Sequence, residues 1–267
     1  MAKGSRKLKE LAEKLDVIVE VRDSRAPAST ASPLIKSLAK IKPVIHVLSR
    51  KDLADPQKLA LWVNSLEHTY AADLRKREGL ATIRRAVMKF APPHREVRLA
   101  VVGIPNVGKS LLLNSLIGKS GANVGNIPGI TKSVSWYRNE GMLIVDSPGI
   151  LDPHAEPGAH MILSWLGCAK ADVVGGWENA AISLVKFLVA NDMAGMIPVE
   201  PDEIPALTLE LIGRKYGCLI SGGRVNMELA GRKFIEAFSS GRLGGVCIEV
   251  PGGERAVDFH DEAAYVV

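Results

Sequence analysis

The sequence of 267 residues has few cysteines and lacks long apolar runs. The three cysteines, Cys168, Cys218 and Cys247, lie far apart, which suits neither a metal-binding knuckle nor a disulfide framework, so we interpret them as reduced. No apolar run reaches the roughly 18 residues of a membrane-spanning helix. The start, MAKGSRKLKE, is not followed by the hydrophobic stretch of a signal peptide. These absences predict a cytoplasmic protein with no membrane partner.

Internal repeats and low-complexity segments are also missing from the chain. The composition, with 47% hydrophobic and 24% charged residues, is that of an ordinary soluble protein. A chain of this length can bury one substantial core and a smaller one, so two domains are expected.

Basic charge is concentrated in the first part of the chain. Residues 1–99 contain 21 Lys/Arg and 11 Asp/Glu, whereas residues 100–267 contain 13 and 18. Three clusters could neutralise the phosphates of a nucleic acid: Lys3-Arg6-Lys7-Lys9, Arg75-Lys76-Arg77 and Arg84-Arg85. The alternative for each cluster taken singly is a solvated helix face.

Short apolar runs alternate with amphipathic stretches over most of the chain. The runs expected to be strands are 17–21, 43–48, 97–102 and 142–146, with 133–137 as a more alternating one. The stretches expected to be helices are 5–15, 56–66, 79–90 and 109–118. This alternation predicts an α/β domain in which helices cover both faces of a mainly parallel sheet.

The pattern changes to helices alone beyond about residue 170. These helices are expected at 177–191, 202–216 and 226–239, separated by turns rich in proline and glycine. We therefore expect one domain over residues 1–170 and an all-helical domain over residues 171–267.

Residues 103–110 read GIPNVGKS and fit the pattern G-x-x-x-x-G-K-[ST] after an apolar strand and before a helix. In such a loop, main-chain N–H groups surround the phosphates, Lys109 reaches the β- and γ-phosphates, and Ser110 ligates Mg²⁺. The sequence thus predicts a nucleoside triphosphate bound with magnesium. The residues expected to contact it are Asn106, Val107, Gly108, Lys109, Ser110 and Leu111.

Two motifs further along the chain complete the phosphate side. DSPG at 146–149 follows a strand, so Asp146 can hold the magnesium shell and Gly149 can offer its N–H to a γ-phosphate. PGIT at 128–131 makes Thr131 the candidate switch threonine, ordered on the metal when the γ-phosphate is present. The alternative for PGIT is a plain proline-glycine turn.

The stretch SRKD at 49–52 follows a strand and predicts which base is bound. Guanine carries an N1–H and an amino group side by side, and the single carboxylate of Asp52 can accept from both. The usual motif is Asn-Lys-x-Asp, so Ser49 and Arg50 depart from it, although both are still expected to belong to the nucleotide site. Ser49 can hydrogen-bond but cannot reach as far as an amide does, and the Arg50 stem could cover the base. In YAAD at 70–73, Ala71 and Ala72 are candidates to lend an N–H to the guanine oxygen.

The order of these motifs is unusual, because the elements that recognise the base precede the phosphate loop. It corresponds to a GTPase core that has been cut and rejoined, a circular permutation that an α/β domain tolerates because its termini commonly lie close together. The sequence therefore predicts a circularly permuted P-loop GTPase domain followed by the helical domain.

This order resembles the YlqF/RbgA family of permuted GTPases, which assist assembly of the large ribosomal subunit. The residues that carry the resemblance are DSRAP (23–27), NIPGITKSVSW (126–136), DSPGIL (146–151) and GCLISGGRVN (217–226). We interpret DSRAP itself as a turn at the end of a strand, with an aspartate that can cap and without a catalytic role. Relatives usually continue upstream through a Trp-Phe-Pro-Gly-His segment, which this sequence does not contain.

The resemblance also implies a mechanism. Ile150 stands where many small GTPases have a glutamine that orients water, and relatives of this kind often recruit K⁺ through an asparagine like Asn106. Slow hydrolysis is therefore expected from the chain alone. The catalytic groups would be Lys109 and Thr131, with Mg²⁺ held by Ser110, Thr131 and Asp146, and the partner would contribute the rest.

The expected partners are GTP or GDP and the large ribosomal subunit with its ribosomal RNA, bound by a monomer. Residues 213–243 hold six basic and two acidic residues, a candidate RNA-facing patch or a solvated helix face. A different hypothesis is a nucleotide-binding scaffold on RNA with little hydrolysis or base discrimination. An ATP-dependent kinase is disfavoured, because no residue is placed as a base for a substrate hydroxyl.

Overall fold

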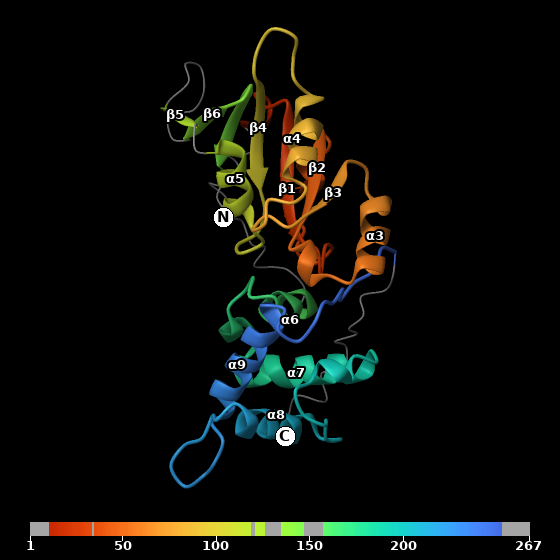
Figure 1. Ribbon diagram of the computed structural model, residues 1–267, viewed down its shortest axis with the longest axis vertical. Coiled ribbons are helices and arrows are strands. Elements are labelled where there is room, and N and C mark those ends of the chain that lie inside the picture. The colour runs from red at the N-terminus through yellow and green to blue at the C-terminus, as the bar shows by residue number, and fades with distance from the viewer. Residues whose placement is uncertain (1–10, 34, 119–120, 126–134, 147–156, 253–267) are drawn as a thin grey trace. The chain divides into compact units, whose positions relative to one another are not determined.

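The computed structural model describes residues 11–33, 35–118, 121–125, 135–146 and 157–252, which fall into two units. The first unit contains the described part of residues 1–153 together with Cys247–Gly252, and the second contains the described part of residues 154–246. Figure 1 shows the sheet in the first unit and the helices of the second.

A seven-stranded sheet forms the first unit, in the order β3-β2-β1-β4-β7-β6-β5. The strands are β1 (Val17–Asp23), β2 (Val44–Ser49), β3 (Thr69–Ala72), β4 (Val97–Val102), β5 (Ala122–Gly125), β6 (Trp136–Asn139) and β7 (Met142–Asp146). Strands β3, β2, β1, β4 and β7 are parallel neighbours, whereas β6 pairs antiparallel with β7 and β5. The expected mainly parallel sheet is confirmed.

Helices and apolar segments cover the sheet on both faces. All seven residues of β1 are buried, as in a central strand covered on both sides. On one face Ala100 and Val102 pack with Leu15 and Leu38. Because side chains alternate along a strand, Val97, Leu99 and Val101 of β4 point to the opposite face.

Four described helices belong to this unit: α2 (Ile35–Leu38), α3 (Pro56–Ser65), α4 (Leu80–Met88) and α5 (Lys109–Ile117). Helix α3 begins where Asp55 accepts a hydrogen bond from the Lys58 N–H and where proline occupies the first helical position, two typical start signals. Helices α4 and α5 contact one another and lie on the near face of the sheet in Figure 1.

The second unit is helical in its described part. Its helices are α6 (Pro157–Trp165), α7 (Trp177–Ala190), α8 (Pro205–Lys215) and α9 (Met227–Ser239), with short 3-10 turns η2 (Ala171–Val174) and η3 (Ala194–Met196). The three helices expected from the sequence, α7, α8 and α9, are confirmed. Helix α9 packs closely on α7, because a Cβ at Gly231 would lie 2.4 Å from the Trp177 carbonyl oxygen. No helix in the described ranges is long and apolar enough to cross a membrane.

Residues Cys247–Gly252, here called the C-terminal strap, return to the sheet-containing unit. The Ile248 N–H donates to the Arg25 carbonyl at 2.7 Å, and Trp62 Nε1 donates to the Glu249 carbonyl at 3.0 Å. Cys247 is buried beside Trp62 and Leu59 of α3. The strap is thereby joined to the turn after β1 and to α3.

Candidate functional site

The loop from β4 into α5 has the shape that phosphate binding requires. Asn106 and Gly108 adopt left-handed φ angles of 63° and 99°, so the main chain turns tightly just before α5 begins at Lys109. A Cβ at Gly103 would lie 2.9 Å from the Val21 carbonyl oxygen, which explains the glycine there. Val107 is buried under the loop, while Asn106, Ser110 and Leu111 are exposed. The loop and the start of the helix therefore present main-chain N–H groups and a partial positive charge to solvent.

Lys109 and Asp146 meet at the carboxyl ends of the parallel strands. Their Nζ and Oδ1 atoms are 2.7 Å apart. Strands β4 and β7 are parallel neighbours with Val101 opposite Asp146, so their carboxyl ends reach the same edge. The structure thus brings together two residues that the sequence assigned to phosphate and magnesium.

The oxygen atoms of Asp146 and Ser110, near the carboxyl ends of β4 and β7, are suitable ligands for Mg²⁺. Mg²⁺ prefers carboxylate and hydroxyl oxygens and is usually held by one or two carboxylates together with substrate phosphates. Asp146 and the exposed Ser110 are of this kind. Across the described ranges, no three His, Cys, Asp or Glu side chains cluster as a metal cage. In sites of this kind, waters and substrate phosphates supply the other ligands.

Ser49 contacts the phosphate loop. Its side chain is almost fully buried, and its Oγ lies 2.5 Å from the Val107 carbonyl oxygen and 3.0 Å from that of Arg22. The hydroxyl has one proton and donates to one carbonyl at a time. Ser49 therefore connects β2, the end of β1 and the phosphate loop.

Arg50 makes a second connection to the same loop. Its main chain is left-handed, with φ of 56°, and its guanidinium lies between two partners. One nitrogen, NH1, is 3.2 Å from Asp23 Oδ2, and the other, NH2, donates to the Asn106 carbonyl at 2.8 Å. The arginine that replaces the usual lysine thus bridges the end of β1 and the phosphate loop.

The DSRAP turn after β1 is a buried charge cluster. Asp23 is fully buried, and its two oxygens accept from the Arg25 main chain at 3.0 Å and from the Arg25 guanidinium at 2.9 Å. Burial alone would raise the pKa of Asp23, but the charges and hydrogen bonds of Arg25 and then the charge of Arg50 hold it below its ordinary value. The sequence had suggested only a capping turn here. An aspartate at the end of a buried strand, with an arginine on either side of it in the sequence, is the pattern that could have indicated a buried ion pair.

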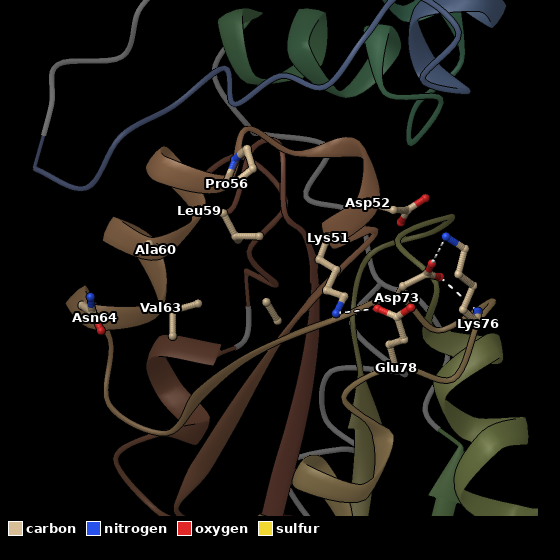
Figure 2. Close-up of a pocket in the computed structure, with 11 residues that line it drawn as sticks. Lys51, Asp52, Pro56, Leu59, Ala60, Val63, Asn64, Asp73, Lys76 and Glu78 are labelled. Carbon is tan, nitrogen blue, oxygen red and sulfur yellow. Dashed lines mark hydrogen bonds and ion pairs between the residues drawn. The ribbon is translucent and has the colours of Figure 1, made fainter.

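Asp52 and Ala71 line a pocket of about 470 Å³, shown in Figure 2. Its other lining residues are Lys51, Pro56, Leu59, Ala60, Val63, Asn64, Asp73, Lys76 and Glu78. In Figure 2, Lys51 points to Glu78, with which it forms a 2.7 Å ion pair, while Asp52 points away from α3. No phosphate-loop residue lines this pocket, and Ala72 is buried outside it. The pocket therefore includes two of the expected base contacts, Asp52 and Ala71, and none of the phosphate-loop residues.

Asp73 shapes the loop after β3 and was not singled out in the sequence. It is buried, and Oδ1 accepts from the Arg75 N–H at 3.0 Å and the Lys76 N–H at 3.1 Å. An aspartate that closes a turn in this way fixes the main chain next to Ala71 and Ala72.

Some expected residues lie outside the described part of the chain. These are Thr131, Gly149, Ile150 and the basic cluster at Lys3-Arg6-Lys7-Lys9. Their assignments stay predictions.

The remaining basic residues are partly engaged in local contacts. Arg84 donates to the Ser115 and Leu116 carbonyls at 3.1 Å, where it caps the end of α5. In the 213–243 patch, Arg232 pairs with Glu236 at 2.9 Å, and Lys233 donates to the Tyr216 carbonyl at 2.9 Å. Exposed pairs such as the Arg232 pair are weak, so Arg232 can still bind a phosphate, whereas Lys233 has a structural contact.

Comparisons with known proteins match the chain to GTPases. Residues 98–180 match the family described as 50S ribosome-binding GTPase. Ribosome biogenesis GTPase A of Bacillus pumilus is 32% identical, covering 94% of this chain and 96% of its own, and that of Thermotoga maritima is 31% identical, covering 93% and 91%.

Solved structures lead to the same family. The GNP-bound structure of YlqF from Thermotoga maritima is 25% identical, with a TM-score of 0.71 over 94% of this chain and all of that one. A GDP-bound YlqF structure has a TM-score of 0.70 at 25% identity, over 93% of this chain and all of that one. The matches confirm the permuted GTPase fold and GTP hydrolysis as the activity. The chain belongs to the ribosome biogenesis GTPase A (YlqF/RbgA) family of circularly permuted GTPases.

Proposed function

We propose that this GTPase assists assembly of the large ribosomal subunit, binding it in the GTP form and leaving after hydrolysis. The proposal is supported by the relatives, which are named ribosome biogenesis GTPases and, in the mouse, mitochondrial ribosome-associated GTPase 1. The observation that carries its nucleotide-dependent part is the 2.7 Å contact between Lys109 and Asp146, beside the turned loop at the start of α5. The alternative of a scaffold without hydrolysis is not favoured, because these relatives are named GTPases.

The phosphate-side residues have distinct proposed roles. Lys109 binds the β- and γ-phosphates, while the N–H groups of residues 106–111 and of Gly149 bind phosphate oxygens. Ser110, Asp146 and Thr131 would hold Mg²⁺, which when bound neutralises charge on the β- and γ-phosphate oxygens. Lys109, now paired with Asp146, would exchange this partner for the phosphates.

The base-side roles follow from the contacts at the ends of β2 and β3. Asp52 is exposed and accepts from the N1–H and amino group of guanine, and the main chain of Ala71 or Ala72 donates to the guanine oxygen. Ser49 and Arg50 act through the main chain of the phosphate loop, because both side chains contact its carbonyls.

Hydrolysis by the isolated chain is proposed to be slow. Ile150 has no hydrogen-bonding group for water, and Arg50 is already engaged with Asp23 and the Asn106 carbonyl. A further positive charge that stabilises the anionic transition state must then come from another group. We propose K⁺ at Asn106, or a group of the ribosomal partner, for this role.

The helical unit is the proposed site of RNA contact, through exposed basic residues such as Arg214 and Arg232. Each RNA phosphate that they neutralise would release a counterion, so binding should weaken as salt increases.

One experiment tests the proposed function. Turnover of GTP is measured for the chain alone and with purified large subunits, in K⁺ and in Na⁺. We expect subunits to stimulate turnover and K⁺ to exceed Na⁺. Equal rates with and without subunits would contradict the role of the ribosomal partner, and equal rates in both salts would contradict the K⁺ site only.

A further inference from the structure

Glu249 of the C-terminal strap holds the turn that follows β1. Its side chain is buried, and its carboxylate accepts from the Ala28 N–H at 2.7 Å and from the Ser29 N–H at 3.1 Å. The Ser29 hydroxyl donates to it as well. Burying a carboxylate costs free energy unless it is hydrogen-bonded. Glu249 therefore favours the conformation in which the strap lies against this turn.

The strap is fixed against the same turn by its main chain. The Ile248 N–H donates to the Arg25 carbonyl, and the Glu249 carbonyl accepts from Trp62 Nε1. The neighbouring Cys247 is buried, which raises the pKa of its thiol to about 11 and keeps it protonated as a small apolar residue. Glu249 is therefore held in place by contacts on both sides.

A continuous set of contacts leads from this turn to the phosphate loop. The turn begins at Asp23, whose N–H is 2.9 Å from the hydroxyl of Thr30, the residue after Ser29. Asp23 in turn contacts Arg50, and Arg50 donates to the Asn106 carbonyl. A shift of the 23–30 turn would move Asp23 and loosen the arginine from the loop.

We propose that Glu249 is a positioning residue for nucleotide binding, acting through the 23–30 turn and Arg50 on the phosphate loop. It lies at the far end of the chain, after the helical unit, and no nucleotide-binding motif includes it. The proposal rests on the nucleotide site assigned above to the phosphate loop. It also gives the strap a role, because nucleotide affinity then depends on the contact between the strap and the 23–30 turn.

The test is a double-mutant cycle on GDP affinity in the full chain. The variants are Glu249→Gln, Arg50→Ala and the double variant, each titrated with GDP and followed through thermal unfolding. Glu249→Gln keeps the size of the side chain but replaces one acceptor oxygen by an N–H₂ group facing main-chain N–H donors. We expect it to weaken GDP binding by about threefold to tenfold, and to cause no further loss when Arg50 is already alanine.

A matched control separates this effect from loss of charge. Glu236→Gln makes the same change on the exposed face of α9, where Glu236 pairs only locally with Arg232, and should leave GDP affinity unchanged. Unchanged affinity in Glu249→Gln, or equal losses in the presence and absence of Arg50, would overturn the proposal. A lower unfolding temperature with unchanged affinity would show a purely structural role and overturn it too.

A further variant distinguishes failure of the inference from failure of the nucleotide site. Lys109→Ala should weaken GDP binding whether or not Glu249 matters. If Lys109→Ala has no effect, the phosphate-loop assignment is wrong; if only Glu249→Gln has none, the positioning role is wrong.

Discussion

The Oγ of Ser49 lies 2.5 Å from the Val107 carbonyl oxygen, so the end of β2 supports the phosphate loop directly. In the usual guanine motif an asparagine occupies this position. The shorter serine reaches the loop because its Cα lies at the end of a buried strand next to β1. The substitution therefore keeps a hydrogen bond between the base-side and phosphate-side elements.

Ser49→Ala should weaken guanine nucleotide binding. The Val107 carbonyl would lose its hydroxyl partner in a buried place, which costs about 1 kcal/mol and corresponds to roughly a fivefold lower affinity. Ser24→Ala is the matched control, because the buried Ser24 hydroxyl has no hydrogen-bond partner among the described residues and its removal should be neutral. Titration with GDP measures both variants, and equal losses would argue against the support of the loop by Ser49.

Asp52→Asn should change which base is preferred. The carboxylate accepts from two N–H groups of guanine, whereas an amide can accept from one and must turn its own N–H₂ to the other. We expect GDP affinity to fall about tenfold to a hundredfold. Xanthine carries an oxygen in place of the amino group, so xanthosine diphosphate should gain on GDP in the variant. An unchanged ratio of the two affinities would show that Asp52 does not contact the base.

Lys109→Ala and Ser110→Ala should each abolish Mg²⁺-dependent turnover without unfolding the chain. Ser110 is exposed at the start of α5, and the ion pair of the half-buried Lys109 is made with the exposed Asp146, so little stability is lost. Lys89→Ala is the control, because Lys89 is an exposed lysine that follows α4 and lies outside the phosphate loop. Wild-type turnover in either phosphate-loop variant would show that the loop does not bind the phosphates and Mg²⁺ as proposed.

Acid should destabilise the sheet-containing unit through two buried carboxylates. Burial would raise the pKa of Glu20, but hydrogen bonds from His46 and Arg22 and the Arg22 charge lower it below its ordinary value; the pKa of Asp23 is lowered by Arg25 and Arg50. Carboxyls of lowered pKa stabilise the fold above their unfolded-state values near pH 4 and lose this effect as pH falls through the folded values.

The unfolding free energy should therefore decrease steadily as pH falls below about 4. Glu20→Gln should make this dependence shallower, by up to about 1.4 kcal/mol per pH unit where its proton is taken up. Glu210→Gln, at a half-buried residue of α8 that pairs only within its own helix, should leave the slope unchanged. Denaturant unfolding at several pH values measures this, and identical slopes in wild type and Glu20→Gln would contradict it.

The fold and the phosphate loop could be predicted because their signals are local. An apolar strand, the GIPNVGKS loop and an amphipathic helix follow one another directly in the sequence, and each requires only neighbouring residues. Repetition of such units predicts the mainly parallel sheet.

The contacts of Ser49, Arg50 and Glu249 could not be predicted in the same way. Ser49 and Arg50 stand at the first two positions of the guanine motif, and both side chains contact carbonyls of the loop more than fifty positions away. Glu249 meets the 23–30 turn across most of the chain length. No spacing rule in one sequence encodes such pairs, because tertiary packing alone brings them together.

Sedimentation of the protein with purified large ribosomal subunits tests the central claim most directly. The protein is mixed with subunits in a non-hydrolysable GTP analogue, in GDP and without nucleotide, at low and at raised salt. We expect it to sediment with subunits in the GTP analogue, to be released in GDP, and to bind less as salt increases. Equal sedimentation with subunits in GDP and in the GTP analogue would contradict the account of a nucleotide-controlled assembly factor.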